Sequence, residues 1–219
     1  MELNLICESN MSLKTLAAAG AAVALSTAVA HAVTFTGTFD VSGPAFSDPG
    51  LVVNVAPNPG PVSFTLSLGD STTFDLFDIW TEEEALSFPE DTTAQDIFVA
   101  FDFTAPPPPF TGTVSGETDG FVFGGSLSSV GRVTWGGTQT VFFGPFGDGV
   151  LELTLSDTEF NRGPLFEFGT LTPGVGFGGT VQLTASYITA ATPIPLPAAG
   201  WLLLAGVGGL GAMRKFRKS

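Results

Sequence analysis

Residues 33–41 read V-T-F-T-G-T-F-D-V, so that large apolar side chains alternate with threonine and aspartate. Val33, Phe35, Phe39 and Val41 fall on one side of an extended chain, and the polar residues fall on the other. This period of two predicts a β-strand with one buried face. The same alternation recurs in residues 62–68 and 151–155 and, over the greatest length, in residues 175–187. No comparable stretch shows helical spacing.

Two stretches depart from simple alternation in informative ways. Residues 97–103, IFVAFDF, are apolar on both sides and predict a central strand. The apolar positions shift register between Phe74-Leu76 and Phe77-Ile79, which predicts a β-bulge. Both features are typical of antiparallel sheets.

Glycine and proline separate these runs. Gly136-Gly137 predicts a two-residue hairpin, and Asp148-Gly149 predicts a turn before the strand that follows. Pro106 to Pro109 predict a stiff polyproline II crossing. About eight to eleven short strands with this punctuation predict an all-β, antiparallel sandwich or jelly roll over residues 33–189, followed by a linker at 190–193.

A body of this size can bury a core without disulfides. Twenty of the 21 phenylalanines lie in it, so we expect phenylalanine packed against valine, leucine and isoleucine.

Residues 33–193 hold 19 acids and two bases, Arg132 and Arg162, which gives a net charge of −17. A surface of that sign repels phosphate backbones, which excludes nucleic-acid binding.

The same body lacks most catalytic side chains. The only cysteine is Cys7 and the only histidine is His31, both outside it, so Ser-His-Asp and Cys-His sites are excluded there. We therefore predict no enzyme, catalytic residue or required cofactor. A glycoside hydrolase could still use two carboxylates, but no spacing selects a pair among 19 acids.

Three further patterns bear on ligands. Asp157, Glu159 and Asn161 approximate a calcium loop, although Gly163 comes one residue late and Phe168 stands where the template has glutamate. Ten acids and no base between residues 70 and 102 predict a solvated face, with calcium as the alternative. Gly174 to Gly179 match the G-x-G-x-x-G motif of dinucleotide sites. That motif requires a helix after it, whereas a strand is expected here, so we do not predict nucleotide binding.

Three aromatic side chains could stack against a sugar, namely Trp80, Trp135 and Tyr187. At one residue per predicted strand, core or rim positions are favoured for them.

The N-terminus predicts a secretory signal peptide. From Met11 the chain reads MSLKT, then an apolar stretch, then Ala30-His31-Ala32. These are the basic, apolar and A-x-A parts of such a peptide, with cleavage after Ala32. The leader spans residues 1–32, or 11–32 if Met11 is the true start.

The C-terminus predicts a membrane segment. Ala198 to Met213 are sixteen uncharged residues, which as a helix reach about 24 Å, short of a ~30 Å hydrocarbon core. Arg214, Lys215, Arg217 and Lys218 follow and favour the cytoplasmic side.

Before this segment stands the motif Ile194-Pro195-Leu196-Pro197-Ala198. Motif, apolar span and basic tail together resemble, over residues 194–219 only, the PEP-CTERM sorting signals of Gram-negative bacteria, in the variant with V-P-L-P-A. The resemblance implies an exosortase, a membrane-embedded cysteine protease, acting near Pro195 to Ala198. It also implies export, surface association or release, and a link to exopolysaccharide.

The sequence thus predicts an exported protein of the cell surface or extracellular matrix, anchored in the membrane until processing, with a structural or adhesive β-sandwich. The alternative is a carbohydrate-binding module assisted by calcium, and the third reading is a carboxylate glycosidase.

Overall fold

The computed structural model describes residues 32–124 and 128–193. Residues 1–31, where the sequence predicts the leader, and residues 194–219, where it predicts the sorting signal, lie outside the described residues. No helix in the described part of the chain is long and apolar enough to cross a membrane, and the span predicted at 198–213 is not among those residues.

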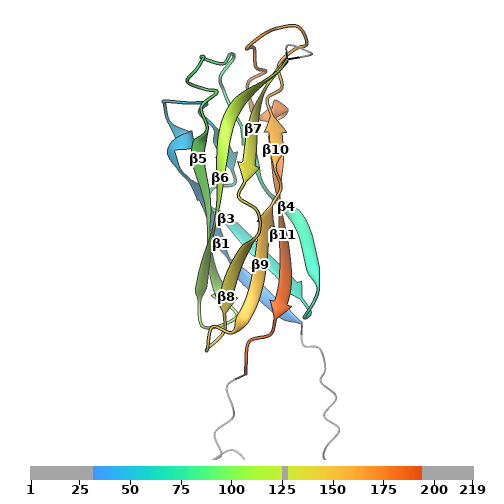
Figure 1. Cartoon of the computed structure of the whole chain (residues 1–219). Helices are drawn as coiled ribbons and strands as arrows, with labels where there is room; N and C mark the ends of the chain where they lie inside the picture. Colours follow the sequence, from blue (N-terminus) through green and yellow to red (C-terminus); the bar gives the residue numbers. More distant parts are fainter. Residues whose placement is uncertain (1–31, 125–127, 194–219) are drawn as a thin grey trace, which may run out of the picture. The chain divides into compact units, whose positions relative to one another are not determined.

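The described residues form two antiparallel sheets (Figure 1). The six-stranded sheet has the spatial order β10 (Thr158–Phe160), β7 (Ser128–Trp135), β6 (Phe110–Phe123), β5 (Gln95–Ala105), β1 (Val33–Ser42) and β3 (Gly60–Leu66). The five-stranded sheet has the order β2 (Asn54–Ala56), β4 (Ser71–Trp80), β11 (Gly179–Thr189), β9 (Gly149–Leu155) and β8 (Gln139–Phe143). Two 3₁₀ turns, η1 (Pro44–Phe46) and η2 (Val175–Phe177), complete the elements. The all-β prediction is confirmed.

One hydrophobic core joins the inner faces of both sheets. Phe35 on β1 is fully buried at its centre. Its ring lies within 6.5 Å, centroid to centroid, of five other aromatic rings, those of Phe64, Phe103, Phe110, Phe143 and Tyr187. The prediction of a phenylalanine core is therefore confirmed.

Strand β5 and the bulge on β4 are where the sequence predicts them. β5 lies between β1 and β6, so it is a central strand. On β4 the register with β11 shifts so that Phe77 faces Val181 while Asp75 faces Gln182. Leu76 is the extra residue, and Leu76 and Phe77 are both buried.

Three local predictions are wrong. Gly136-Gly137 does not close a hairpin, because β7 before it and β8 after it belong to different sheets. Pro106 to Pro109 do not form a crossing, because they connect two paired neighbours, with Phe103 opposite Phe110. The long alternating run starts as a strand at Gly179, not at residue 175, because η2 occupies Val175–Phe177.

Candidate functional site

The two ends of the body lie at one end of the sandwich, which we call the base. Val33 and Pro193 line the same cavity of about 360 Å³. β4 runs away from the base, since Ser71 pairs with Ser186 and Ile79 with Gly179. The segments 81–94, after β4, and 161–178, before β11, therefore lie at the far end (Figure 1). We call these two segments the distal loops.

Exposed apolar side chains gather at these two ends. Among the described residues, the large apolar side chains that are exposed on the distal loops are Phe88, Leu165, Phe166, Phe168, Val175 and Phe177. Those exposed near the base are Leu68, Phe142, Phe146 and Ile188. Since a scattered exposed apolar residue is ordinary but a cluster is not, both ends are candidate contact surfaces.

The distal cluster is built around stacked phenylalanines. The rings of Phe88 and Phe168 stack at 5.2 Å between centroids, joining the two distal loops. Phe166, two residues before Phe168 on the same loop, is 77% exposed and has a φ of 69°. A bulky residue in this left-handed region is strained by about 1–3 kcal/mol, which is the kind of cost found at functional sites.

Hydrogen bonds hold the backbone under this cluster. Leu86 N–H donates to Gly169 O at 2.7 Å, and Leu171 N–H donates to Glu84 O at 2.8 Å. Gly169 N–H donates to the buried hydroxyl of Ser129 at 2.9 Å. The exposed rings thus stand on a fixed backbone, which lowers the entropy lost when a partner binds.

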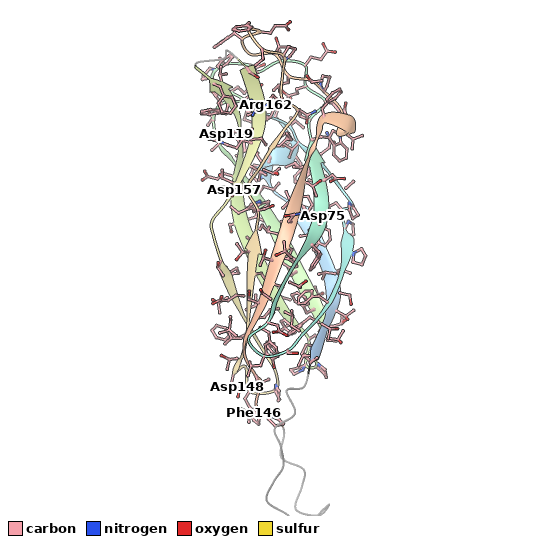
Figure 2. All side chains as sticks on the ribbon, turned by 90° about the vertical axis from the view of Figure 1, so that its right-hand side faces the viewer. Asp75, Asp119, Phe146, Asp148, Asp157 and Arg162 are labelled. Carbon is pink, nitrogen blue, oxygen red and sulfur yellow. The ribbon has the colours of Figure 1, made fainter. Side chains whose placement is uncertain are left out.

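Both arginines of the body lie toward the distal end (Figure 2 labels Arg162). Arg132 donates two hydrogen bonds to Asp119, at 3.0 and 2.7 Å, and its guanidinium lies 4.6 Å from the ring centroid of Phe121. Arg162 pairs with Glu159 and lies 4.8 Å from the centroid of Phe123. Arginine stacked on phenylalanine is a composition enriched in protein contact surfaces.

The structure does not bring the calcium candidates together as ligands. Asp157 accepts the backbone N–H of Trp135 at 2.8 Å, and Glu159 pairs with Arg162. Asn161 is fully buried, and its amide oxygen accepts the N–H of Thr81 at 2.8 Å. Within residues 32–124 and 128–193, no group of three or more histidine, cysteine, aspartate or glutamate side chains is placed to hold a metal ion.

Asn161 instead fastens the distal loops. Its amide nitrogen donates to the carbonyls of Thr172 and Gly174, at 2.6 and 3.0 Å. Its φ of 50° is one that asparagine tolerates better than most residues. Asn161 is therefore a structural residue of the candidate site that sequence reasoning placed in the wrong role.

The ten acids between residues 70 and 102 are spread over strands and loops. Asp75 and Asp78 accept hydrogen bonds from Gln182 and Thr180 on the neighbouring strand β11. Asp91 is only 3% exposed and accepts the N–H of Ser87 at 2.6 Å. The acids on the strands are exposed to solvent, but they do not share the one face predicted from the sequence, because β4 and β5 belong to different sheets. Asp91 has a structural role in a distal loop.

One of these acids has an altered pKa. Burial raises the pKa of Glu83, and the charges of Asp91 and Asp48 raise it further. A hydrogen bond from Val52 N–H at 2.8 Å opposes the shift. Since Asp91 is enclosed, this pair offers no open face where a sugar could lie between two carboxylates.

The three candidate stacking aromatics do not form a platform. Trp135 is buried with its ring edge-on to Phe77, and Tyr187 is buried beside Phe35 and Phe143 at the base. Trp80 is half-buried and donates to Glu82 at 2.8 Å. The favoured core or rim positions are confirmed.

The comparisons with known proteins add no relationship. No protein-family model matches the sequence, and neither the curated proteins nor the solved structures gave a significant match.

Proposed function

We propose that this chain is an exported, sortase-processed protein of the cell surface or extracellular matrix, with a structural or adhesive and non-enzymatic role. The observation that carries the proposal is the division of the body into two ends. The chain enters and leaves at the base, and the fixed phenylalanine cluster lies on the distal loops. A tail that holds the base at the membrane would point this cluster toward the surroundings.

Charge supports a local, apolar contact. A net charge of −17 over residues 33–193 makes bodies repel one another and other acidic surfaces. This repulsion is screened within about 10 Å at 0.1 M salt, whereas burial of phenylalanine gives about 1.5–3 kcal/mol per side chain at contact. We therefore assign adhesion to the distal cluster, since the negative charge of the surrounding surface repels acidic partners.

The sorting step is tested by cell fractionation with antibodies against the body. Pro195 and Pro197 each fix φ near −65° and would hold the motif extended for a protease cleft. We expect the double variant Pro195→Ala, Pro197→Ala to be exported but retained, uncleaved, in the membrane. Equal release of wild-type and variant chains, independent of the host's exosortase gene, would show that the motif is only a linker.

The adhesive role is tested by retention of the released protein in the host's extracellular matrix and by binding to the exopolysaccharide purified from it. Phe166→Ser with Phe168→Ser should reduce both, and Leu68→Ser with Phe142→Ser at the base is the matched control. Equal losses in both variants would contradict the assignment to the distal loops. Loss on adding a calcium chelator would favour the carbohydrate-binding alternative.

A further inference from the structure

The base carries its own apolar patch, made of Leu68, Phe142, Phe146 and Ile188, which we call the base patch. Each of these side chains is about half exposed or more, and Phe146 is 64% exposed. Phe146 lies at the tip of the β8–β9 hairpin (Figure 2).

Strand register and one turn hydrogen bond place three of these side chains at the same end of the five-stranded sheet. Phe142 on β8 pairs with Val150 on β9, and Val150 pairs with Thr189 on β11. Ile188 lies at the register shift just before Thr189. Gly69 N–H donates to Tyr187 O at 2.8 Å, which places the turn containing Leu68 against the same end of β11.

The chain leaves the body beside this patch. The N–H of Thr192 donates to both carboxylate oxygens of Asp148, at 3.1 Å each, and its hydroxyl also donates to that carboxylate. Ala191 packs against Gly144, where any side chain would collide with it. The exit segment and the hairpin that carries Phe146 are thus fastened to each other, with Figure 2 showing Phe146 and Asp148 together at the lower end.

The length of chain that follows limits how far the base can be from a membrane. The apolar segment predicted from the sequence begins at Ala198, five residues after Pro193. Five residues span at most about 18 Å when fully extended. When the tail is inserted, residues 194–198 therefore act as a short tether that keeps the base patch within about 18 Å of the membrane.

We infer that the base patch is a membrane-contact site that rests on the lipid interface while the tail is embedded. This inference depends on the membrane insertion of the tail in the proposed function. Apolar aromatic side chains on a loop tip gain free energy by entering the headgroup boundary. The tether gives an effective concentration in the millimolar range, so a weak contact is enough to keep the base on the lipid.

The charges near the base determine which lipid headgroups the base patch favours. The carboxylate of Asp148 is engaged by Thr192, and Asp70 is the other acid in the turn next to the patch. No arginine of the described body is at this end, since Arg132 and Arg162 both contact phenylalanines at the end of β6. The contact should therefore be strongest on zwitterionic lipid, and anionic lipid should weaken it.

A second copy of the chain is a less suitable occupant, because two bodies of net charge −17 repel each other and the tether brings lipid, not a partner, to the patch. Contact with lipid would also hold residues 194–198 at a fixed height over the membrane. The base patch would then position the sorting motif for its protease.

The test uses the mature chain from Val33 to Ser219, which has no cysteine of its own, reconstituted in phosphatidylcholine vesicles, with single introduced cysteines that carry an environment-sensitive fluorophore. Phe146→Cys probes the base patch, Phe166→Cys is the control at the distal loops, and Trp201→Cys reports insertion of the tail. We expect probes at 146 and 201 to shift to the blue and to be several-fold less quenched by acrylamide, a neutral quencher, than the probe at 166. Adding phosphatidylglycerol should reduce protection at 146 alone, and high salt should restore it.

The failures are distinguishable. Protection at 201 with equal quenching at 146 and 166 would overturn the base patch inference and leave the anchored tail intact. Free quenching at 201 would overturn the membrane insertion of the tail, and the base patch inference with it. Protection at 146 that rises with phosphatidylglycerol would also overturn the inference, because it would indicate electrostatic binding.

Discussion

The side-chain oxygen of Asn161 accepts the backbone N–H of Thr81 at 2.8 Å and so joins two loops that are 80 residues apart in the sequence. The hydrogen bonds from its nitrogen to Thr172 and Gly174 complete a junction that is closed to solvent. The junction holds the two distal loops, which carry the exposed phenylalanines, to each other.

Asn161→Asp should therefore destabilise the body. Aspartate keeps the oxygen that accepts from Thr81, but it cannot donate to two carbonyls and it brings a charge into a buried site. We expect a loss of about 3 kcal/mol or more in the free energy of unfolding, measured by urea denaturation at neutral pH. Unfolding in the presence of added calcium tests the alternative that Asn161 belongs to a calcium loop, since an added carboxylate would strengthen such a loop. Rescue of the variant by calcium would revive the metal site.

Glu83→Gln should stabilise the body at neutral pH. The raised pKa of Glu83 means that the folded state holds its proton more tightly than the unfolded state, so stability falls as pH rises from the ordinary value to the raised one. Glutamine keeps an oxygen for Val52 N–H and removes the charge near Asp91. We expect a gain of about 0.5 kcal/mol or less, because the site is partly solvated. Glu84→Gln, an exposed neighbour, is the control, and an equal gain there would assign the effect to net charge alone.

Gly131→Ala should lower the melting temperature, whereas Gly136→Ala should have little effect. A Cβ at Gly131 would overlap the buried ring of Phe160, and such overpacking costs about 1–3 kcal/mol. At Gly136 the nearest atom, Ser115 O, would be 3.3 Å away. Thermal unfolding followed by circular dichroism compares the two variants. An unchanged melting temperature for Gly131→Ala would contradict the close packing of β10 on β7.

Phe35→Ala should be among the most destabilising core substitutions. Its ring contacts aromatic residues of both sheets, so its removal leaves a cavity that the rigid neighbours cannot fill. We expect a loss of about 3–5 kcal/mol by denaturant unfolding. Phe142→Ala, which truncates an exposed phenylalanine, should change stability by no more than about 0.5 kcal/mol. Comparable losses would mean that the two sheets do not share this core.

The mature protein should begin at Val33, since Ala30 and Ala32 are the small residues that a signal peptidase requires. Val33 is also the first residue of β1, so cleavage after Ala32 would leave the strand complete. Mass spectrometry of exported protein measures the N-terminus directly. Retention of residues 11–31 would show that the leader is not removed.

Side-chain alternation predicted the strands well, because burial of one face imposes a period of two on β1 and β9. It could not predict which sheet a strand joins. Gly136-Gly137 has the composition of a hairpin turn, but the partner of β7 is β6, and no local pattern reveals that pairing. Alternation also predicted a strand at Val175 and Phe177, where the chain forms a 3₁₀ turn instead and both side chains are exposed. Glycines at 174, 176 and 178 allow this turn.

The distal cluster was missed for a related reason. Leu165, Phe166 and Phe168 lie between Gly163 and Gly169, and an apolar run flanked by glycines was a visible signal of an exposed apolar loop. The stacking of Phe168 on Phe88, 80 residues earlier in the sequence, is a tertiary contact. Asn161 was misassigned because spacing alone does not show whether an amide faces a cation or the backbone of another loop.

The direction of β11 has a mechanical consequence. The strand starts at Gly179 beside the distal loops, ends at Thr189 at the base, and is hydrogen-bonded to β4 on one side and β9 on the other. A pull between an object held by the distal loops and a tail fixed in a membrane would act along this strand. Its two ladders of hydrogen bonds would then be loaded in shear and share the force, instead of opening one at a time as they would under a pull across the sheet.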